Sequence, residues 1–308
     1  MELWRTRGVL AEVIWRESSP STNAELRALA TRPGGDALPH GTLLATSNQT
    51  AGRGRLDRSW VTPPDTAIAA SLLIRGFTGL GIGWLPLLTG SAVVAALQPF
   101  FGEGLRVGVK WPNDVHLRDE EDAIAGRPGK KLCGILCELL PDGSVVVGTG
   151  INLLIPEWEL PTERATSLLA AGADLMAGAA SAGSAPAESV PAGAASAGSA
   201  RSELAGEHEG ADPSLADALG HDLADRVLAA YAGELLRLIE LAASDPDAAR
   251  ARVARHSLTL GTEVRVHLPG GEVVDGRARR LAEDGSLMVD LPTGGVLTVS
   301  AGDVEHLR

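Results

Sequence analysis

The amino-acid sequence predicts an α+β protein: a mixed, mostly antiparallel sheet with flanking helices, followed by a small C-terminal β-barrel. The first observation is that residues 41–152 contain several short apolar or alternating runs, interrupted by one apolar helical stretch. The second is that residues 258–308 consist of short strand-like runs separated by Gly-containing turns, which is typical of a small all-β domain. We therefore expect one domain at 1–256 and a second at 257–308.

The elements of the first domain are predicted from local patterns. Ser21, Thr22 or Asn23 can cap a helix within 18–29. Residues 105–111 alternate between apolar and polar side chains, as in a strand with one buried face. The polar stretch 119–130 is expected to be a long hairpin loop. The other expected elements are strands at 41–46, 66–75, 131–140 and 145–147, and helices at 84–101, 214–243 and 248–256.

Composition excludes several classes of protein. The net charge of -12 and the pI near 5.1 argue against a nucleic-acid partner held by bulk charge. The two cysteines, Cys133 and Cys137, make neither a disulfide framework nor a zinc set, and small buried side chains are their expected role. The N-terminus lacks the apolar run of a signal peptide, and 84–101 reads as too short and interrupted to span a bilayer. These features predict a cytoplasmic protein without a membrane partner.

A low-complexity tract interrupts the first domain at about 173–213. It consists mostly of Ala, Gly, Ser, Pro and Glu, and the octapeptide GAASAGSA occurs in it twice, at 178–185 and 193–200. Such a tract cannot bury enough apolar surface to offset the entropy lost on ordering. We therefore expect a disordered insertion here.

The stretch 46–60, TSNQTAGRGRLDRSW, is the first candidate for function. It places Arg53, Arg55 and Arg58 among Gly52 and Gly54. Glycine permits close backbone approach to a ligand, and the guanidinium fork matches phosphate or carboxylate. The stretch is therefore expected to close over an anion, although a solvated surface turn would have the same composition.

Polar side chains at two strand ends are further candidates. Lys110, Asn113 and Asp114 stand where the predicted strand 105–111 ends, and Asn152 stands where a later strand runs out. An Asx-type turn would explain Asn113 and Asp114 equally well. The only other lysines are Lys130 and Lys131, which suggests that a compact ammonium is needed here, unless the lysines cluster by chance.

Taken in order, the motifs STN at 21–23, GRGRLDRSW at 52–60, KWPND at 110–114, KLCGIL at 131–136 and GTGINL at 148–153 resemble the biotin protein ligases, or biotin–[acetyl-CoA-carboxylase] ligases. The resemblance implies a class II synthetase-like catalytic domain and an SH3-like barrel. It implies that biotin and ATP, with Mg²⁺, form biotinyl-5′-AMP, and that biotin then passes to a lysine of a biotin carboxyl carrier protein. Because Ser21 lies so near the start, we expect the form without an N-terminal DNA-binding domain.

The resemblance also implies roles for individual residues. It assigns none of them as a metal ligand. Asp57 stands where the family usually has Gly, and Lys131 is preferred to Lys130 because it directly precedes Leu132. The catalytic residues would be Lys131, Arg53, Asp114 and Lys110. The residues in contact with biotin would be Ser21, Thr22, Asn23, Gln49, Gly52, Arg53, Arg55, Lys131 and Gly134. The residues in contact with the nucleotide would be Arg55, Arg58, Trp60, Lys110, Asn113 and Asn152.

Two other functions remain open. A lipoate or octanoate protein ligase resembles the same catalytic fold, and a non-catalytic biotin-binding protein could keep it. Serine and metal hydrolases are disfavoured because the chain has neither G-x-S-x-G nor H-E-x-x-H. For the oligomeric state, a monomer and a homodimer are both compatible with the sequence.

Overall fold

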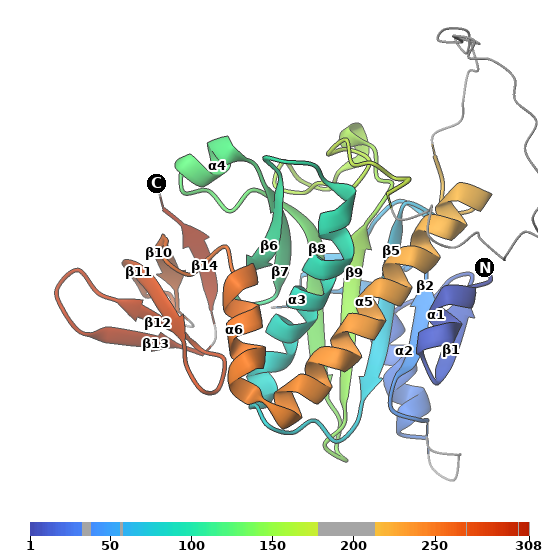
Figure 1. Cartoon of the computed structure of the whole chain (residues 1–308), viewed down its shortest axis with the longest axis horizontal. Helices are drawn as coiled ribbons and strands as arrows, with labels where there is room; N and C mark the ends of the chain where they lie inside the picture. Colours follow the sequence, from blue (N-terminus) through green and yellow to red (C-terminus); the bar gives the residue numbers. More distant parts are fainter. Residues whose placement is uncertain (33–37, 56–57, 178–212, 269, 301, 308) are drawn as a thin grey trace, which may run out of the picture.

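The computed structural model describes residues 1–32, 38–55, 58–177, 213–268, 270–300 and 302–307, and its core is a seven-stranded sheet (Figure 1). Only β1 and β2 pair in parallel, and every other neighbouring pair in this sheet is antiparallel, which confirms the predicted mixed, mostly antiparallel sheet. In spatial order the strands are β1 (Glu12–Arg16), β2 (Thr42–Thr46), β5 (Ala67–Ile74), β9 (Val145–Asn152), β8 (Lys130–Leu139), β7 (Asp114–Arg118) and β6 (Arg106–Lys110).

Helices cover both faces of the sheet. On one face α3 (Leu85–Leu97) packs against β6 to β9, and the long α5 (Ala218–Ser244) packs against α3, as Figure 1 shows. The helix α6 (Pro246–His256) packs on α3 and α5, and α1 (Trp4–Val9) packs on α5. On the other face α2 (Thr22–Ala30) packs against β5 and β9. The apolar helix expected at 84–101 is thus α3, and it packs on the sheet.

The apolar segment of α3 is longer than the sequence suggested. The 3-10 turns η1 (Ile82–Trp84) and η2 (Gln98–Phe100) extend the helix at its two ends, so the segment has 19 residues and is long and apolar enough to cross a membrane. The prediction that it was too short is therefore wrong. The segment is nevertheless 67% buried within the protein, because α5 and the sheet enclose it, so it serves as a core helix.

Several elements were missing from the prediction. The helix α1 and the strands β1 and β14 (Asp303–His306) were not expected, and the predicted hairpin loop contains α4 (Glu120–Ile124). Asp119 caps α4, since its carboxylate accepts a hydrogen bond of 2.7 Å from the backbone N–H of Asp122. The strand β9 continues five residues beyond the predicted end and stops at Asn152.

The C-terminal strands form an open sheet, so the predicted barrel is wrong. Their order is β13 (Val296–Val299), β12 (Leu287–Asp290), β11 (Val273–Leu281), β10 (Glu263–His267) and β14, all antiparallel. A barrel requires the two edge strands to pair. Among the described residues β13 pairs with β12 and β14 with β10, so the edge strands stay apart.

The C-terminal sheet is attached to the first domain by hydrogen bonds at the end of β6. The indole of Trp111 donates to the carbonyl of Gly285 (3.1 Å), and the backbone N–H of Trp111 donates to Thr259 Oγ1 (3.0 Å). The Lys110 ammonium donates to the carbonyl of Val304 at 2.7 Å. The last of these bonds holds β14 close to the strand end that carries the KWPND motif.

Most of the low-complexity tract, residues 178–212, lies outside the described residues. The expectation of disorder concerns these residues and stays a prediction. Residues 173–177, which the prediction placed in the tract, belong to the packed domain. Leu175 packs against the core, and the N–H of Asp174 donates to the carbonyl of Phe100 at 2.9 Å. The guanidinium of Arg226 in α5 also donates to the carbonyls of Leu175 and Ala177.

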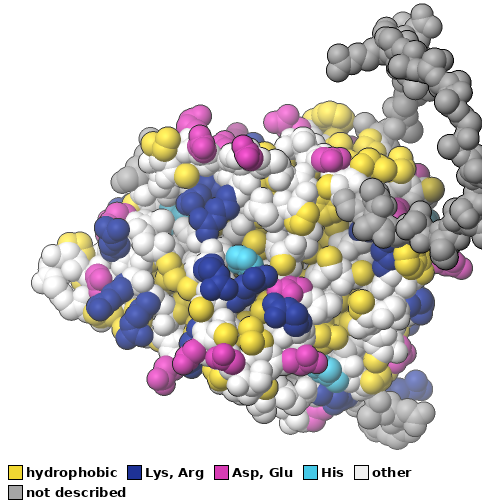
Figure 2. Space-filling model, viewed as in Figure 1, with side chains coloured by type: hydrophobic (Ala, Val, Ile, Leu, Met, Phe, Trp, Pro, Cys, Tyr) yellow, Lys and Arg dark blue, Asp and Glu magenta, His cyan; other side chains and the backbone are white. Residues whose placement is uncertain are grey.

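Basic side chains gather on one part of the surface despite the acidic net charge. Figure 2 shows Lys and Arg around the upper end of α6 and the neighbouring edge of the sheet. Arg106 donates to the carbonyl of Arg255 at 2.7 Å. Burial, followed by the charges of Arg252, Arg255 and Arg106, lowers the pKa of His256. None of these residues lines the pocket described next.

Candidate active site

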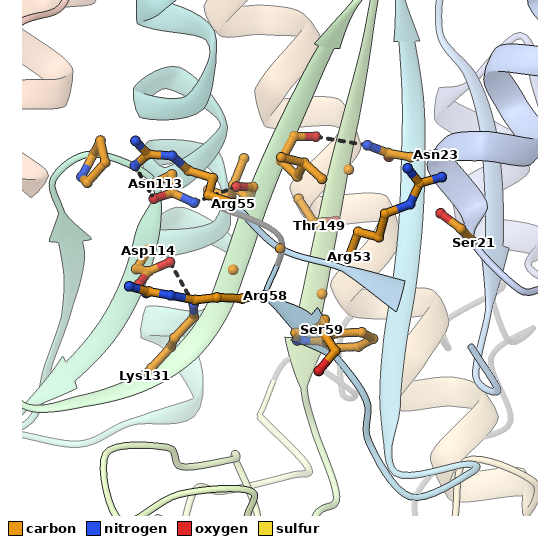
Figure 3. Close-up of a pocket in the computed structure, with 18 of the residues that line it drawn as sticks. Ser21, Asn23, Arg53, Arg55, Arg58, Ser59, Asn113, Asp114, Lys131 and Thr149 are labelled. Carbon is orange, nitrogen blue, oxygen red and sulfur yellow. Dashed lines mark hydrogen bonds and ion pairs between the residues drawn. The ribbon is translucent and has the colours of Figure 1, made fainter. Parts of the chain in front are cut away.

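A pocket of about 960 Å³, counted out to its open mouth, lies on the face of the main sheet that carries α2. Its walls come from the start of α2, the hairpin formed by β3 (Gly52–Arg53) and β4 (Ser59–Trp60), and the strands β7, β8 and β9 (Figure 3). The structure thus brings together segments that are more than a hundred residues apart. Of the residues predicted from the sequence, the pocket is lined by Ser21, Thr22, Asn23, Gln49, Arg53, Gly54, Arg55, Arg58, Trp60, Lys110, Asn113, Asp114, Lys131 and Gly134.

The α2 end of the pocket is a cluster of uncharged polar groups. The side chain of Ser21 caps α2, and the backbone N–H of Thr22 donates to Gln49 Oε1 at 2.8 Å. Asn23 Nδ2 donates to the carbonyl of Leu136 at 3.1 Å, which ties α2 to β8. The buried hydroxyl of Ser71 in β5 lies 2.8 Å from Thr22 Oγ1 and 2.7 Å from Asn23 Oδ1. This end can therefore hold a neutral ligand rich in donors and acceptors.

The Arg-rich stretch is a short hairpin over the pocket. Gly52 pairs with Trp60 and Arg53 with Ser59, and the N–H of Gly54 donates to the carbonyl of Arg58 at 2.6 Å. Arg55 reaches across and donates to Asn113 Oδ1 at 3.1 Å, as Figure 3 shows. Leu56 and Asp57 lie outside the described residues, so the departure from the family pattern at Asp57 lies outside them too.

Lys131 and Asp114 form the charged centre of the pocket. Lys131 Nζ lies 2.7 Å from Asp114 Oδ1, across the paired strands β8 and β7 (Figure 3). Gly134 leaves room for this pair, because a Cβ atom there would lie 3.1 Å from Lys131 Nζ. Lys130, the other candidate lysine, is exposed and does not line the pocket.

The electrostatic surroundings keep Asp114 ionised. Burial raises the pKa of Asp114, but the neighbouring His116 and Lys131 together outweigh burial, so the pKa lies well below its usual range. The two cysteines are inert by comparison, because burial raises the pKa of both Cys133 and Cys137 to about 12. The reactive groups of the pocket are thus its cations and one carboxylate.

Asn113 is fixed between two strands. Its Nδ2 donates to the carbonyl of Ile135 at 2.6 Å, and the N–H of Ile135 donates back to the carbonyl of Asn113 at 3.0 Å. Because Nδ2 bonds to Ile135, the amide is oriented so that Oδ1 accepts the hydrogen bond from Arg55. The amide thus positions the guanidinium at the pocket wall.

Two predicted residues do not line the pocket. Gly52 is buried beneath Gln49, where a side chain would overlap the amide of Gln49. Asn152 is buried, and its Nδ2 donates to the carbonyl of Thr166 at 2.9 Å, so the amide joins two backbone segments.

The sequence reasoning overlooked several lining residues. Glycines at 148 and 150 in β9 leave space for Asn23 and Trp60, and their alternate spacing in GTGIN could have indicated a strand approached closely on one face. Gly302 comes from the C-terminal domain, for which the sequence offered no signal. The full set of such residues is Ser59, Pro112, Ile135, Leu136, Gly148, Thr149, Gly150 and Gly302.

The arrangement is suited to binding anions beside a neutral polar group. Two lysines and three arginines line the pocket with a single carboxylate, so the site can offset the charge of a carboxylate and a polyphosphate together. Within the part of the chain that the structure describes, no group of three His, Cys, Asp or Glu side chains could hold a metal ion.

Comparison with known sequences identifies both parts of the chain. Residues 17–154 match the profile of the Biotin/lipoate A/B protein ligase family, and residues 259–307 match that of the Biotin protein ligase C terminal domain. The biotin–[acetyl-CoA-carboxylase] ligase of Mycobacterium tuberculosis is 33% identical over 311 residues, which cover 99% of this chain and 90% of the relative.

Two further comparisons agree with this. The bifunctional ligase/repressor BirA of Bacillus spizizenii is 32% identical over 156 residues, which cover 49% of this chain and 43% of the relative. Among solved structures, the biotin protein ligase of Aquifex aeolicus in complex with biotin and ATP superposes with a TM-score of 0.61, covering 97% of this chain and 100% of that one. At 23% identity, this last match establishes the shared fold.

Proposed function

Because this chain belongs to the biotin protein ligase family, we propose that biotin and ATP react in the pocket between α2, the β3–β4 hairpin and the paired strands β7 and β8. The activity is that of an ATP-dependent biotin–[acetyl-CoA-carboxylase] ligase. Biotin and ATP give biotinyl-5′-AMP and diphosphate, and the biotinyl group then passes to a lysine of a carrier protein. The observation that supports the assignment of roles is the Lys131–Asp114 ion pair, in a pocket that Arg53 and Arg55 also line.

The first step joins two anions, so cations carry most of the catalysis. The carboxylate of biotin attacks the α-phosphorus of ATP, and negative charge builds up on the phosphoryl oxygens. Lys131 and Lys110 line the pocket where these oxygens would lie, and each ammonium lowers the energy of that charge. The polar groups of Ser21, Thr22, Asn23 and Gln49 at the other end are proposed to hydrogen-bond biotin.

The Arg-rich hairpin is proposed to retain the product of this step. Biotinyl-5′-AMP is a mixed anhydride that water would hydrolyse, so a cover that excludes water preserves it. Arg53, Arg55 and Arg58 can each place a guanidinium over the adenylate, and Trp60 lies against β9 beneath the hairpin. Asn113 supports this cover through its bond to Arg55.

The second step releases a proton, and Asp114 is proposed to accept it. The amine of the carrier lysine attacks the carbonyl carbon of the adenylate, and AMP leaves. The low pKa keeps Asp114 ionised, so its carboxylate is available to hydrogen-bond the incoming amine, from which it is proposed to take the proton. Mg²⁺ would be carried on the phosphates of ATP, since the described side chains offer no metal cluster.

Two assays separate this function from its alternatives. Incubation with ATP, a carrier domain and either labelled biotin or labelled lipoate should label the carrier with biotin. Labelling by lipoate and none by biotin would instead identify a lipoate protein ligase. Biotin-dependent release of pyrophosphate should accompany the reaction. If no pyrophosphate is released although the carrier is active, the chain would be a non-catalytic biotin-binding protein.

The physiological setting is also a proposal. A ligase of this kind acts on a carrier protein, and we propose the biotin carboxyl carrier of an acyl-CoA carboxylase. We propose a cytoplasmic location, with neither nucleic acid nor membrane as a partner. Light scattering of the purified chain, with and without biotin, distinguishes a monomer from a homodimer.

A further inference from the structure

His116 is a buried histidine with one nitrogen directed at the charged centre of the pocket. It follows Asp114 by two residues in β7, so both side chains leave the same face of the strand. Its Nδ1 lies 3.1 Å from the carbonyl oxygen of Gly129. A carbonyl oxygen only accepts hydrogen bonds, so Nδ1 carries the proton, and Nε2 of the neutral ring carries a lone pair.

This Nε2 faces Asp114 without bonding to it. The distance from Nε2 to Asp114 Oδ2 is 4.0 Å, and Nε2 is buried with no hydrogen-bond partner. Two acceptors repel each other, which accounts for the separation. One added proton would replace the repulsion by a charge-assisted hydrogen bond, whose usual length is about 2.7–2.9 Å. Together, the two side chains can therefore take up one proton.

The charges around the pair decide where that proton would rest. Burial lowers the pKa of His116, and the charge of Lys110 in β6 lowers it further, while Asp114 raises it. The other oxygen of Asp114 is bound to Lys131 of β8 at 2.7 Å. On β14, His306 has its own pKa lowered by burial and by Lys110, His116 and Arg118, so it adds no charge near neutral pH. His116 is thus neutral before the reaction and able to accept.

We propose that His116 is a positioning residue of the transfer step, which acts through Asp114 by taking up the proton that Asp114 receives. The inference rests on the proposed function of this pocket. As the lysine Nζ forms its bond to the carbonyl carbon, the bond from that carbon to the AMP oxygen breaks, and AMP leaves with the electron pair. The proton lost by Nζ moves to Asp114 Oδ2 and on to His116 Nε2, which becomes an imidazolium beside a carboxylate.

The proposal predicts a change in the pH profile of one step only. Enzyme preloaded with biotinyl-5′-AMP is mixed with carrier domain in a single turnover between about pH 4.5 and 8. In the wild type, transfer needs a neutral lysine and a neutral His116, so the logarithm of the rate rises with a slope near two below the pKa of His116. In His116→Gln the slope should stay near one, and the rate near pH 7 should fall by roughly tenfold or more.

A second measurement separates this role from a structural one. Pyrophosphate release by His116→Gln should fall much less than transfer, because adenylate formation removes no proton from an amine. Equal losses in both steps, or a transfer slope identical to that of the wild type, would overturn the proposal. His116→Leu provides the same comparison if the glutamine variant folds poorly. His267→Gln, a partly exposed histidine of β10, is the matched control and should keep the wild-type slope.

Failure of this inference differs from failure of the proposed function. If the wild-type chain released no pyrophosphate in response to biotin, the function itself would be wrong. If it released pyrophosphate and transferred biotin while His116→Gln kept the wild-type pH slope, only the role of His116 would be wrong.

Discussion

The indole of Trp60 lies directly against the backbone of Gly150: a Cβ atom at Gly150 would stand 2.9 Å from Trp60 Nε1. Trp60 belongs to β4, which pairs with Gly52 and Arg53 of β3, so this contact seats the whole Arg-rich hairpin on β9. The position of the hairpin over the pocket therefore depends on a strand that lies about ninety residues away in the sequence.

Gly150→Ala should displace the hairpin and weaken ATP binding. Overpacking costs about 1–3 kcal/mol, so the KM for ATP should rise by roughly tenfold. Gly233→Ala in α5 is the matched control, since no neighbouring atom lies within 4 Å of its Cβ position, and it should bind ATP normally. Steady-state pyrophosphate release is the measurement, and equal KM values for the two variants would contradict the seating of Trp60 on Gly150.

Lys131→Ala should reduce adenylate formation by roughly a hundredfold or more, as expected for the loss of one preorganised charge-stabilising donor. Lys130→Ala is the control, because Lys130 is exposed and stands outside the pocket. Biotin-dependent pyrophosphate release measures both variants. A larger loss in Lys130→Ala would transfer the assigned role to the neighbouring lysine.

Arg53→Gln should release the adenylate faster while binding biotin almost normally. The guanidinium lines the pocket from the hairpin, where it can contact the phosphate, and the polar groups at the start of α2 remain to bind biotin in the variant. Loss of one exposed charged contact should raise the dissociation rate of biotinyl-5′-AMP by roughly tenfold. Stopped-flow chase with unlabelled biotin measures this rate. Arg237→Gln, on the exposed side of α5, should leave it unchanged.

His306 should make the protein less stable in mild acid. Burial, with the nearby charges of Lys110, His116 and Arg118, lowers the pKa of His306 to about 3 in the folded state. The unfolded chain binds this proton below about pH 6.5, so unfolding takes up a proton between these two values. Stability is therefore complete above about pH 6.5 and falls as the pH drops towards 3.

His306→Gln removes this titration and keeps a polar side chain near Thr259. Urea unfolding at pH 7 and pH 4 should show a smaller loss of stability in the variant than in the wild type. The same difference between the two proteins at both pH values would mean that His306 does not titrate on unfolding. Since His306 lies in β14, the result also reports on the contact between the C-terminal sheet and β6.

Much of the fold could be predicted because periodicity is a local property. The alternation at 105–111, the apolar runs at 66–75 and 131–140 and the helical spacing at 214–243 each appear in the structure within a few residues. The strands β1 and β14 were not predicted, because segments of five and four residues show little periodicity by themselves. The edge strand β6 is as short as β1, but its alternating pattern extends over residues 105–111. The barrel was predicted wrongly because closure depends on pairing between β13 and β14, which no local pattern encodes.

By itself, the sequence determined which residues are available for chemistry and that the motifs belong together, since residue type and order can be read along the chain. Only the tertiary structure showed that Lys131, the lysine preferred from the sequence, lies 2.7 Å from Asp114, that His116 Nε2 lies 4.0 Å from the same carboxylate, and that Asn152 and Gly52 do not line the pocket. The physical reason is strand register. A shift of one residue moves a side chain to the opposite face of a sheet, and the bulge between Val115 and His116 sets that register here.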